Sequence, residues 1–97
     1  MRKEEIYSKY SKKFGVKNVV KGRRNRFSDI IANRAFDETY KTYYRNINAS
    51  EEEIKNLILA EIKTEFTGFF AIIQWLIWIH KIIIFIEFVL SELKKES

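Results

Sequence analysis

Residues 68–90 read GFFAIIQWLIWIHKIIIFIEFVL, and this stretch decides the fold. Fifteen of its 23 residues are Ile, Leu, Val or Phe, and it contains no Pro. At about 1.5 Å per residue it forms a helix about 35 Å long, whereas the hydrocarbon core of a bilayer is about 30 Å thick. A chain of 97 residues has too little other surface to cover such a helix alone. The sequence therefore predicts a C-terminal helix that is buried in a bilayer or in a large assembly.

Polar side chains divide this apolar helix into unequal faces. At about 100° per residue, Gln74 and Lys81 lie on one stripe, and His80 and Glu87 lie on a second. Lys81 has no acidic residue three or four positions away, and Glu87 has no cation there. Because charges inside a membrane are almost always paired, we expect these four side chains to make intramembrane or inter-subunit contacts with neighbouring chains. The remaining arc is predicted to face lipid and contains Ile72, Trp75, Leu76, Ile79, Ile83, Ile86 and Leu90.

The long helix is expected to begin well before its apolar part. Ser50 and Glu53 form a capping box, in which each side chain accepts the other residue's backbone N–H. No strong stop follows until Lys94 and Lys95, whose charges suit the C-terminal end of a helix dipole. Gly68 costs only about 1 kcal/mol inside a helix and predicts at most a bend. The sequence therefore predicts one helix over 50–95, amphipathic at 50–66 and transmembrane at 67–93, with a short tail at 94–97.

The N-terminal segment, residues 1–49, is predicted to contain two shorter helices. Apolar residues at helical spacing indicate a first helix over 3–14, which Gly15 ends as a left-handed cap. Ser28 and Asp29 are good N-cap residues for a second helix of about five turns, and residues 46–49 break it. The predicted fold class is all-α, with two short N-terminal helices followed by one long C-terminal helix that spans the membrane once.

Positive charge is concentrated in the first half of the chain. Residues 1–50 hold 13 Lys and Arg against 5 Asp and Glu, whereas residues 51–97 hold 5 against 8. The connection between the two short helices contains cations and no acid, and its candidate residues for binding an anionic partner are Lys17, Lys21, Arg23, Arg24 and Arg26. Three interpretations stay open: they bind nucleic acid with Phe27 stacked on a base, anionic lipid headgroups, or acidic protein neighbours.

The sequence contains no motif for catalysis or for metal binding. There is no Cys, which excludes disulfides, thiolate chemistry and Cys-ligated zinc. There is also no Gly-rich phosphate loop, zinc-ligand spacing or nucleophile motif. We therefore expect no catalytic, cofactor-binding or metal-binding residues and a non-enzymatic role.

The leading hypothesis is a structural or accessory subunit that anchors a large membrane-associated assembly, such as a respiratory-type complex or a membrane-containing virion. Its partners would be other protein subunits, membrane lipid and, through residues 17–27, nucleic acid. The basic flank places the N-terminus on the cytoplasmic, matrix or virion-interior side of a single-pass helix. One alternative is a soluble virion protein, a helical bundle whose basic segment contacts the genome. Another is a pore of holin or viroporin type, lined by the polar stripes.

Overall fold

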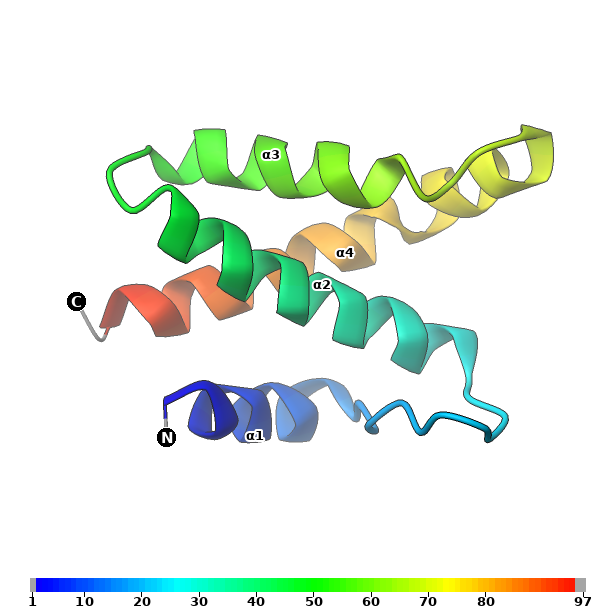
Figure 1. Ribbon diagram of the computed structural model, residues 1–97, viewed down its shortest axis with the longest axis horizontal. Helices are drawn as coiled ribbons and strands as arrows, with labels where there is room; N and C mark the ends of the chain where they lie inside the picture. The colour runs from blue at the N-terminus through cyan, green and yellow to red at the C-terminus, as the bar shows by residue number, and fades with distance from the viewer. Residues whose placement is uncertain (1, 96–97) are drawn as a thin grey trace.

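The computed structural model of the protein describes residues 2–95, and the regular secondary structure of this part of the chain is all helical, with no strand. Its four helices are α1 (Arg2–Phe14), α2 (Phe27–Arg45), α3 (Glu51–Lys63) and α4 (Phe69–Lys95). Successive helices run in opposite directions along the molecule (Figure 1). The all-α class and the long apolar C-terminal helix are therefore confirmed.

The end of α1 is set by a glycine, as the sequence predicts. Gly15 has a φ of +66°, the left-handed conformation that closes helices and that glycine adopts without strain. The Val16 N–H donates to the carbonyl of Ser11 at 3.1 Å, and the Ser11 hydroxyl donates to the carbonyl of Val16 at 2.6 Å. These two bonds turn the chain out of the helix toward α2.

The start of α2 does not use the predicted N-cap. Arg26 occupies the cap position, and its side chain makes no capping hydrogen bond. Asp29 lies inside the first turn, where its carboxylate accepts hydrogen bonds from the Lys17 N–H at 3.1 Å and from the Arg26 guanidinium at 3.2 Å. The prediction that Ser28 and Asp29 cap the helix is therefore wrong, because Lys17, distant in sequence, takes the carboxylate that a cap would use.

The predicted continuous helix over 50–95 is wrong, although its start is right. Ser50 Oγ accepts the N–H of Glu53 at 3.1 Å, and the Glu53 carboxylate accepts the N–H of Ser50 at 3.4 Å, which confirms the capping box. α3 nevertheless ends at Lys63, and the chain reverses over residues 64–68. Gly68 has a φ of +87°, and the ring of Phe66 packs 5.5 Å from that of Trp75 on α4. Tertiary packing thus converts the expected bend into a full reversal.

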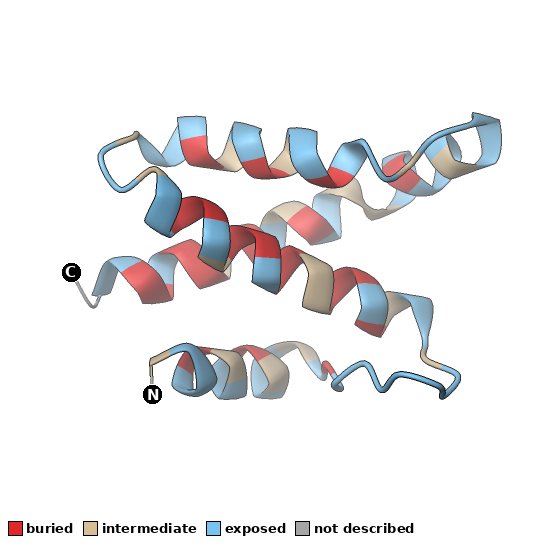
Figure 2. Ribbon diagram, viewed as in Figure 1, coloured by how far each residue is buried: buried red, intermediate tan, exposed pale blue. Residues whose placement is uncertain are grey.

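The C-terminal half of α4 lies at the centre of the core (Figure 2). Its buried apolar residues are Ile82, Phe85, Ile86, Val89, Leu90 and Leu93. The ring of Tyr10 on α1 lies 5.6 Å from that of Phe85 and 5.3 Å from that of Phe36 on α2. Trp75, Ile86 and Leu90 are buried and therefore do not face lipid in this fold, which corrects part of the predicted apolar arc. The reason is the reversal at 64–68, which lays α4 against the other three helices.

The bundle has two different ends along its longest dimension of 39 Å. The α1–α2 connection and the α3–α4 turn both lie at one of them, on opposite sides of the bundle, and we call this the loop end (Figure 1). The start of α1, the α2–α3 turn and the end of α4 lie at the other. Connections that are far apart in the sequence therefore lie at the same end of the molecule.

Candidate functional site

Large apolar side chains are exposed at the loop end. Phe69 and Phe70 are 76% and 81% exposed. Within the described chain, α4 is the one helix long and apolar enough to cross a membrane, yet only 22% of its most apolar 18-residue window, with a mean hydropathy of 2.1, is buried. A core helix of a soluble protein buries most of such a window. The exposed residues at the start of α4, which we call the apolar tip, are Phe69, Phe70, Ile72, Ile73, Leu76 and Ile77.

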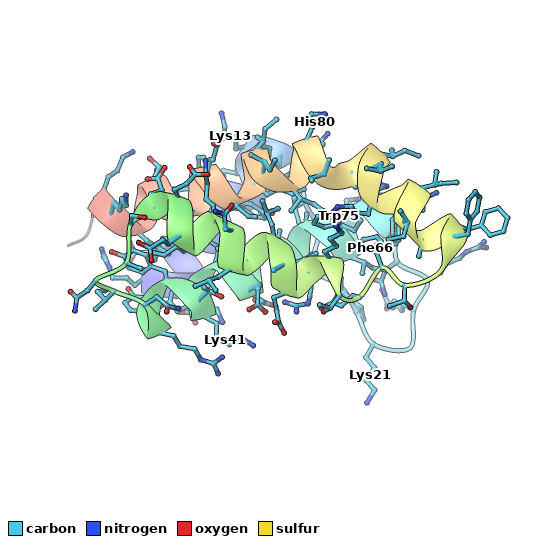
Figure 3. The ribbon with its side chains drawn as sticks, turned by 90° about the horizontal axis from the view of Figure 1, so that it is seen from above. Lys13, Lys21, Lys41, Phe66, Trp75 and His80 are labelled. Atoms are coloured by element: carbon cyan, nitrogen blue, oxygen red, sulfur yellow. The ribbon has the colours of Figure 1, made fainter. Side chains whose placement is uncertain are left out.

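Two tryptophans hold the apolar tip against the bundle. Trp75 is buried and packs on Phe66 of the α3–α4 turn, as Figure 3 shows. Trp78 is half-buried, and its ring lies 5.7 Å from that of Phe27 at the start of α2 in an edge-to-face arrangement. Such aromatic pairs fix the angle at which the free half of α4 leaves the core.

A groove of about 400 Å³ opens between α2, the α3–α4 turn and α4. Its apolar walls include Phe27, Ile30, Ile62, Phe66 and Ala71, and Gln74 lines it as well. One wall carries an ion pair in which the Arg34 guanidinium donates to Glu65 Oε2 at 2.7 Å. No His, Cys or Ser of residues 2–95 lines the groove, so its chemistry is that of an apolar binding surface.

The α1–α2 connection, residues 15–26, holds its cations on a fixed backbone; we call it the basic loop. The Arg23 N–H donates to the carbonyl of Val20 at 3.2 Å, and Gly22 has a φ of +83°, as the third residue of a type II turn requires. Asn25 closes the turn: its Oδ1 accepts the Val20 N–H at 3.0 Å, and its amide donates to the carbonyls of Val20 and Arg23. The turn projects Lys21 away from the helices (Figure 3).

The basic loop is tied to α2 through Asp29 and Asn33. The Asn33 amide donates to the carbonyl of Lys17 at 2.9 Å, beside the bond from the Lys17 N–H to Asp29. The hydrogen bonds from Arg26 and from the backbone of Lys17 lower the pKa of Asp29, so this carboxylate stays ionised while it holds the loop. The same ion pair balances the positive charge of Arg26 within the protein.

The other predicted cations of the loop remain available for an outside partner. Lys17, Lys21, Arg23 and Arg24 are exposed, and none of them forms an ion pair within residues 2–95. Val19 and Val20, in the same loop, are also exposed. The structure places these cations at the loop end, where the apolar tip lies as well (Figure 1). In the sequence, the basic loop and the apolar tip belong to separate segments, and the fold brings both to one end of the molecule.

The predicted polar residues of α4 do not form one cluster. His80 and Lys81 are exposed, with no hydrogen bond or ion pair inside the described region, and His80 lies on the outer side of α4 (Figure 3). Glu87 instead accepts a hydrogen bond from Lys55 of α3 at 3.0 Å. For Glu87 the expectation of a partner on a neighbouring chain is corrected, because the reversal at 64–68 brings α3 alongside.

Reasoning from the sequence missed the apolar tip as a distinct surface. Residues 68–90 are mostly apolar in both halves, and the four polar residues among them do not separate a core half from an exposed half. Comparisons with known protein families, curated proteins and solved structures found no match. A function can therefore be proposed only from the surface of the protein, above all from the apolar tip and the basic loop.

Proposed function

We propose that the protein is a non-enzymatic structural component that attaches an assembly to a membrane, with α4 as its lipid-contacting element. The observation that carries this proposal is the apolar tip. Its six large side chains lie side by side on the first turns of one helix, with Phe69 and Phe70 more than three-quarters exposed. Exposed patches of this kind mark surfaces that bind a membrane or another protein.

The two halves of α4 would have different roles in such an anchor. The C-terminal half is buried in the core, so the apolar tip is rigidly connected to the rest of the bundle. The far end of the molecule exposes Tyr44 and Ile47 near the α2–α3 turn, and these supply a surface for other subunits. The protein would then link a membrane at one end to protein at the other.

A second candidate is a soluble helical component that contacts nucleic acid. It is favoured by the burial of the C-terminal half of α4 within its own chain, which needs no lipid. The basic loop would then hold phosphates. This candidate leaves the apolar tip without a partner, so we rank it below membrane attachment.

Fractionation of cells that express the full chain tests the proposal. We expect the protein in the membrane pellet, and detergent to be needed for its extraction. Phe69→Ser/Phe70→Ser should move it toward the soluble fraction, whereas Leu57→Ser, which removes an exposed apolar side chain outside the apolar tip and the proposed subunit surface, should not. A wild-type chain that stays soluble without detergent and does not pellet with membranes would refute membrane attachment.

A further inference from the structure

We infer, on the basis of the proposed membrane attachment, that the folded bundle stands with its loop end on an anionic lipid surface. The apolar tip enters the acyl region, and Lys21, Arg23 and Arg24 of the basic loop bind lipid phosphates. The bundle keeps its fold in this state, so α4 dips into one leaflet and does not cross the bilayer.

The depth of insertion follows from where the core begins. The apolar tip covers residues 69–77, which make a helix of roughly 13 Å, less than half of a hydrocarbon core of about 30 Å. From Ile82 onward the buried face of α4 packs on the other helices. A full span would have to pull that face away from Tyr10 and Phe36. The folded protein can therefore bury its tip in lipid and no more.

Phe69 and Phe70 are placed to enter the bilayer first. They are the first two residues of α4, directly after the left-handed Gly68, and their rings meet edge to face at 5.6 Å. Both are more exposed than the other large apolar residues of the described chain. Two adjacent aromatic rings at the apex of a turn form a compact wedge that needs no further folding to insert.

The charges of the basic loop select the lipid. Lys21, Arg23 and Arg24 have no acidic partner within residues 2–95, and the Asn25 hydrogen bonds fix the turn that carries them. Each cation near an anionic surface strengthens binding about fivefold. At the opposite end, the start of α3 exposes Glu51, Glu52 and Glu53, of which Glu51 is paired with Lys94 and Glu52 with Lys55. The orientation is therefore set by the loop end, where the apolar tip and the cations of the basic loop both lie.

The mixture of apolar and basic side chains favours lipid over nucleic acid. A phosphate backbone would attract the same cations, but it offers no apolar phase for Val19, Val20 and the apolar tip. A membrane surface supplies both, with phosphates at the headgroups and hydrocarbon a few ångströms below. The surface chemistry at the loop end is therefore complementary to an anionic bilayer.

Vesicle flotation with the purified full chain tests this inference. The probes are vesicles of phosphatidylcholine alone and vesicles that also contain phosphatidylserine. Lys21→Gln/Arg23→Gln/Arg24→Gln should lower the partition coefficient on phosphatidylserine vesicles roughly 100-fold. Lys3→Gln/Lys41→Gln/Arg45→Gln removes the same charge from a cluster on α1 and α2 and should change it far less. All six side chains are exposed, and circular dichroism checks that each variant is folded.

Insertion depth is read from two further probes. Trp75 and Trp78 are the protein's only tryptophans; Trp75 lies within the stretch of the apolar tip and Trp78 directly follows it, so brominated lipids should quench their fluorescence on binding. The chain has no Cys, so Ser91→Cys gives a single thiol on the exposed side of the core half. It should stay reactive toward a membrane-impermeant maleimide on intact vesicles.

The outcomes separate the inference from the proposed function. Equal binding to both vesicle types, or equal losses in the two triple variants, overturns the basic loop as the lipid site but leaves membrane attachment standing. If the thiol of the Ser91→Cys variant becomes unreactive on vesicles, α4 crosses the bilayer and end-on binding is overturned. Loss of nucleic-acid binding without loss of vesicle binding in the loop variant assigns the loop to nucleic acid instead. Binding to neither vesicle type rejects membrane attachment itself.

Discussion

Lys55 Nζ on α3 lies 3.0 Å from Glu87 Oε2 on α4. The bond joins residues 32 positions apart across the chain reversal, and it raises the pKa of Lys55. Lys55 also lies 3.8 Å from Glu52 on its own helix. The Lys55–Glu87 pair therefore reports directly on whether α3 and α4 lie antiparallel in solution.

A double-mutant cycle with Lys55→Met and Glu87→Gln should give a coupling energy of about 0.5–1 kcal/mol in chemical unfolding. The magnitude is modest because the Glu87 side chain is 49% exposed and water screens the pair. A parallel cycle between Lys81 and Glu87 serves as the control and should give no coupling. Zero coupling for Lys55 and Glu87 would show that the two helices do not pack as described.

Gly68→Ala should destabilise the folded bundle by about 1–2 kcal/mol in urea unfolding, because alanine resists a left-handed backbone. A Cβ added at Gly68 meets no atom within 4 Å, so the cost is conformational and not a clash. The same holds for Gly22, with a φ of +83°, so Gly22→Ala is the matched control. Only Gly68→Ala should also raise helix content by circular dichroism, because it favours continuation of α3 into α4.

Ser50→Ala should cost about 1 kcal/mol of stability through loss of the N-cap and its reciprocal bond with Glu53. Ser28→Ala, at the position where a cap was predicted but not found, should cost clearly less. Thermal unfolding of the two variants side by side measures the difference. Equal losses would argue against the capping box.

Glu38 should make folding sensitive to acid. Its burial alone would raise the pKa, but hydrogen bonds from Arg34 at 2.7 Å and Thr42 at 3.1 Å outweigh burial and hold the pKa below that of an ordinary Glu. The unfolded chain therefore binds this proton at a higher pH than the folded chain does. The stabilisation is complete above about pH 5 and is lost as the pH falls through the folded pKa.

The acid limb of the stability profile should consequently be shallower in Glu38→Gln than in the wild type. At neutral pH the variant should lose about 1–3 kcal/mol, because a charged hydrogen bond is removed from a buried site. Asp37→Asn, one residue away but exposed, should leave the slope nearly unchanged. Unfolding by urea at several pH values between 3 and about 7 measures both slopes. Parallel profiles for wild type and Glu38→Gln would contradict this role.

Signals that are local in sequence were enough to place three helix ends. Gly15 ends α1, Ser50 and Glu53 start α3, and Lys95 ends α4, because a cap depends on side chains within one turn of itself. The cap predicted at Ser28 failed for the opposite reason. Asp29 is bound by Lys17, a contact that no local pattern reveals.

The reversal at 64–68 and the surface it creates required tertiary information. Phe66 packs on Trp75, and Glu65 pairs with Arg34 of α2, so the turn is held by contacts from both neighbouring helices. Without the reversal, the apolar stretch reads as a uniform membrane span. The five cations of the basic loop were identified from sequence, but their position at the same end as the apolar tip was not.

The core half of α4 is the last part of the core to be synthesised. α1, α2 and α3 leave the ribosome before the helix whose buried face completes their core, so the bundle closes late. Until then both halves of α4 are open to lipid or to chaperones. Under the proposed membrane attachment, a nascent chain that closes quickly would offer a membrane only the apolar tip, whereas slow closure would expose the whole helix. The rate of folding would then decide how deeply the protein enters the bilayer.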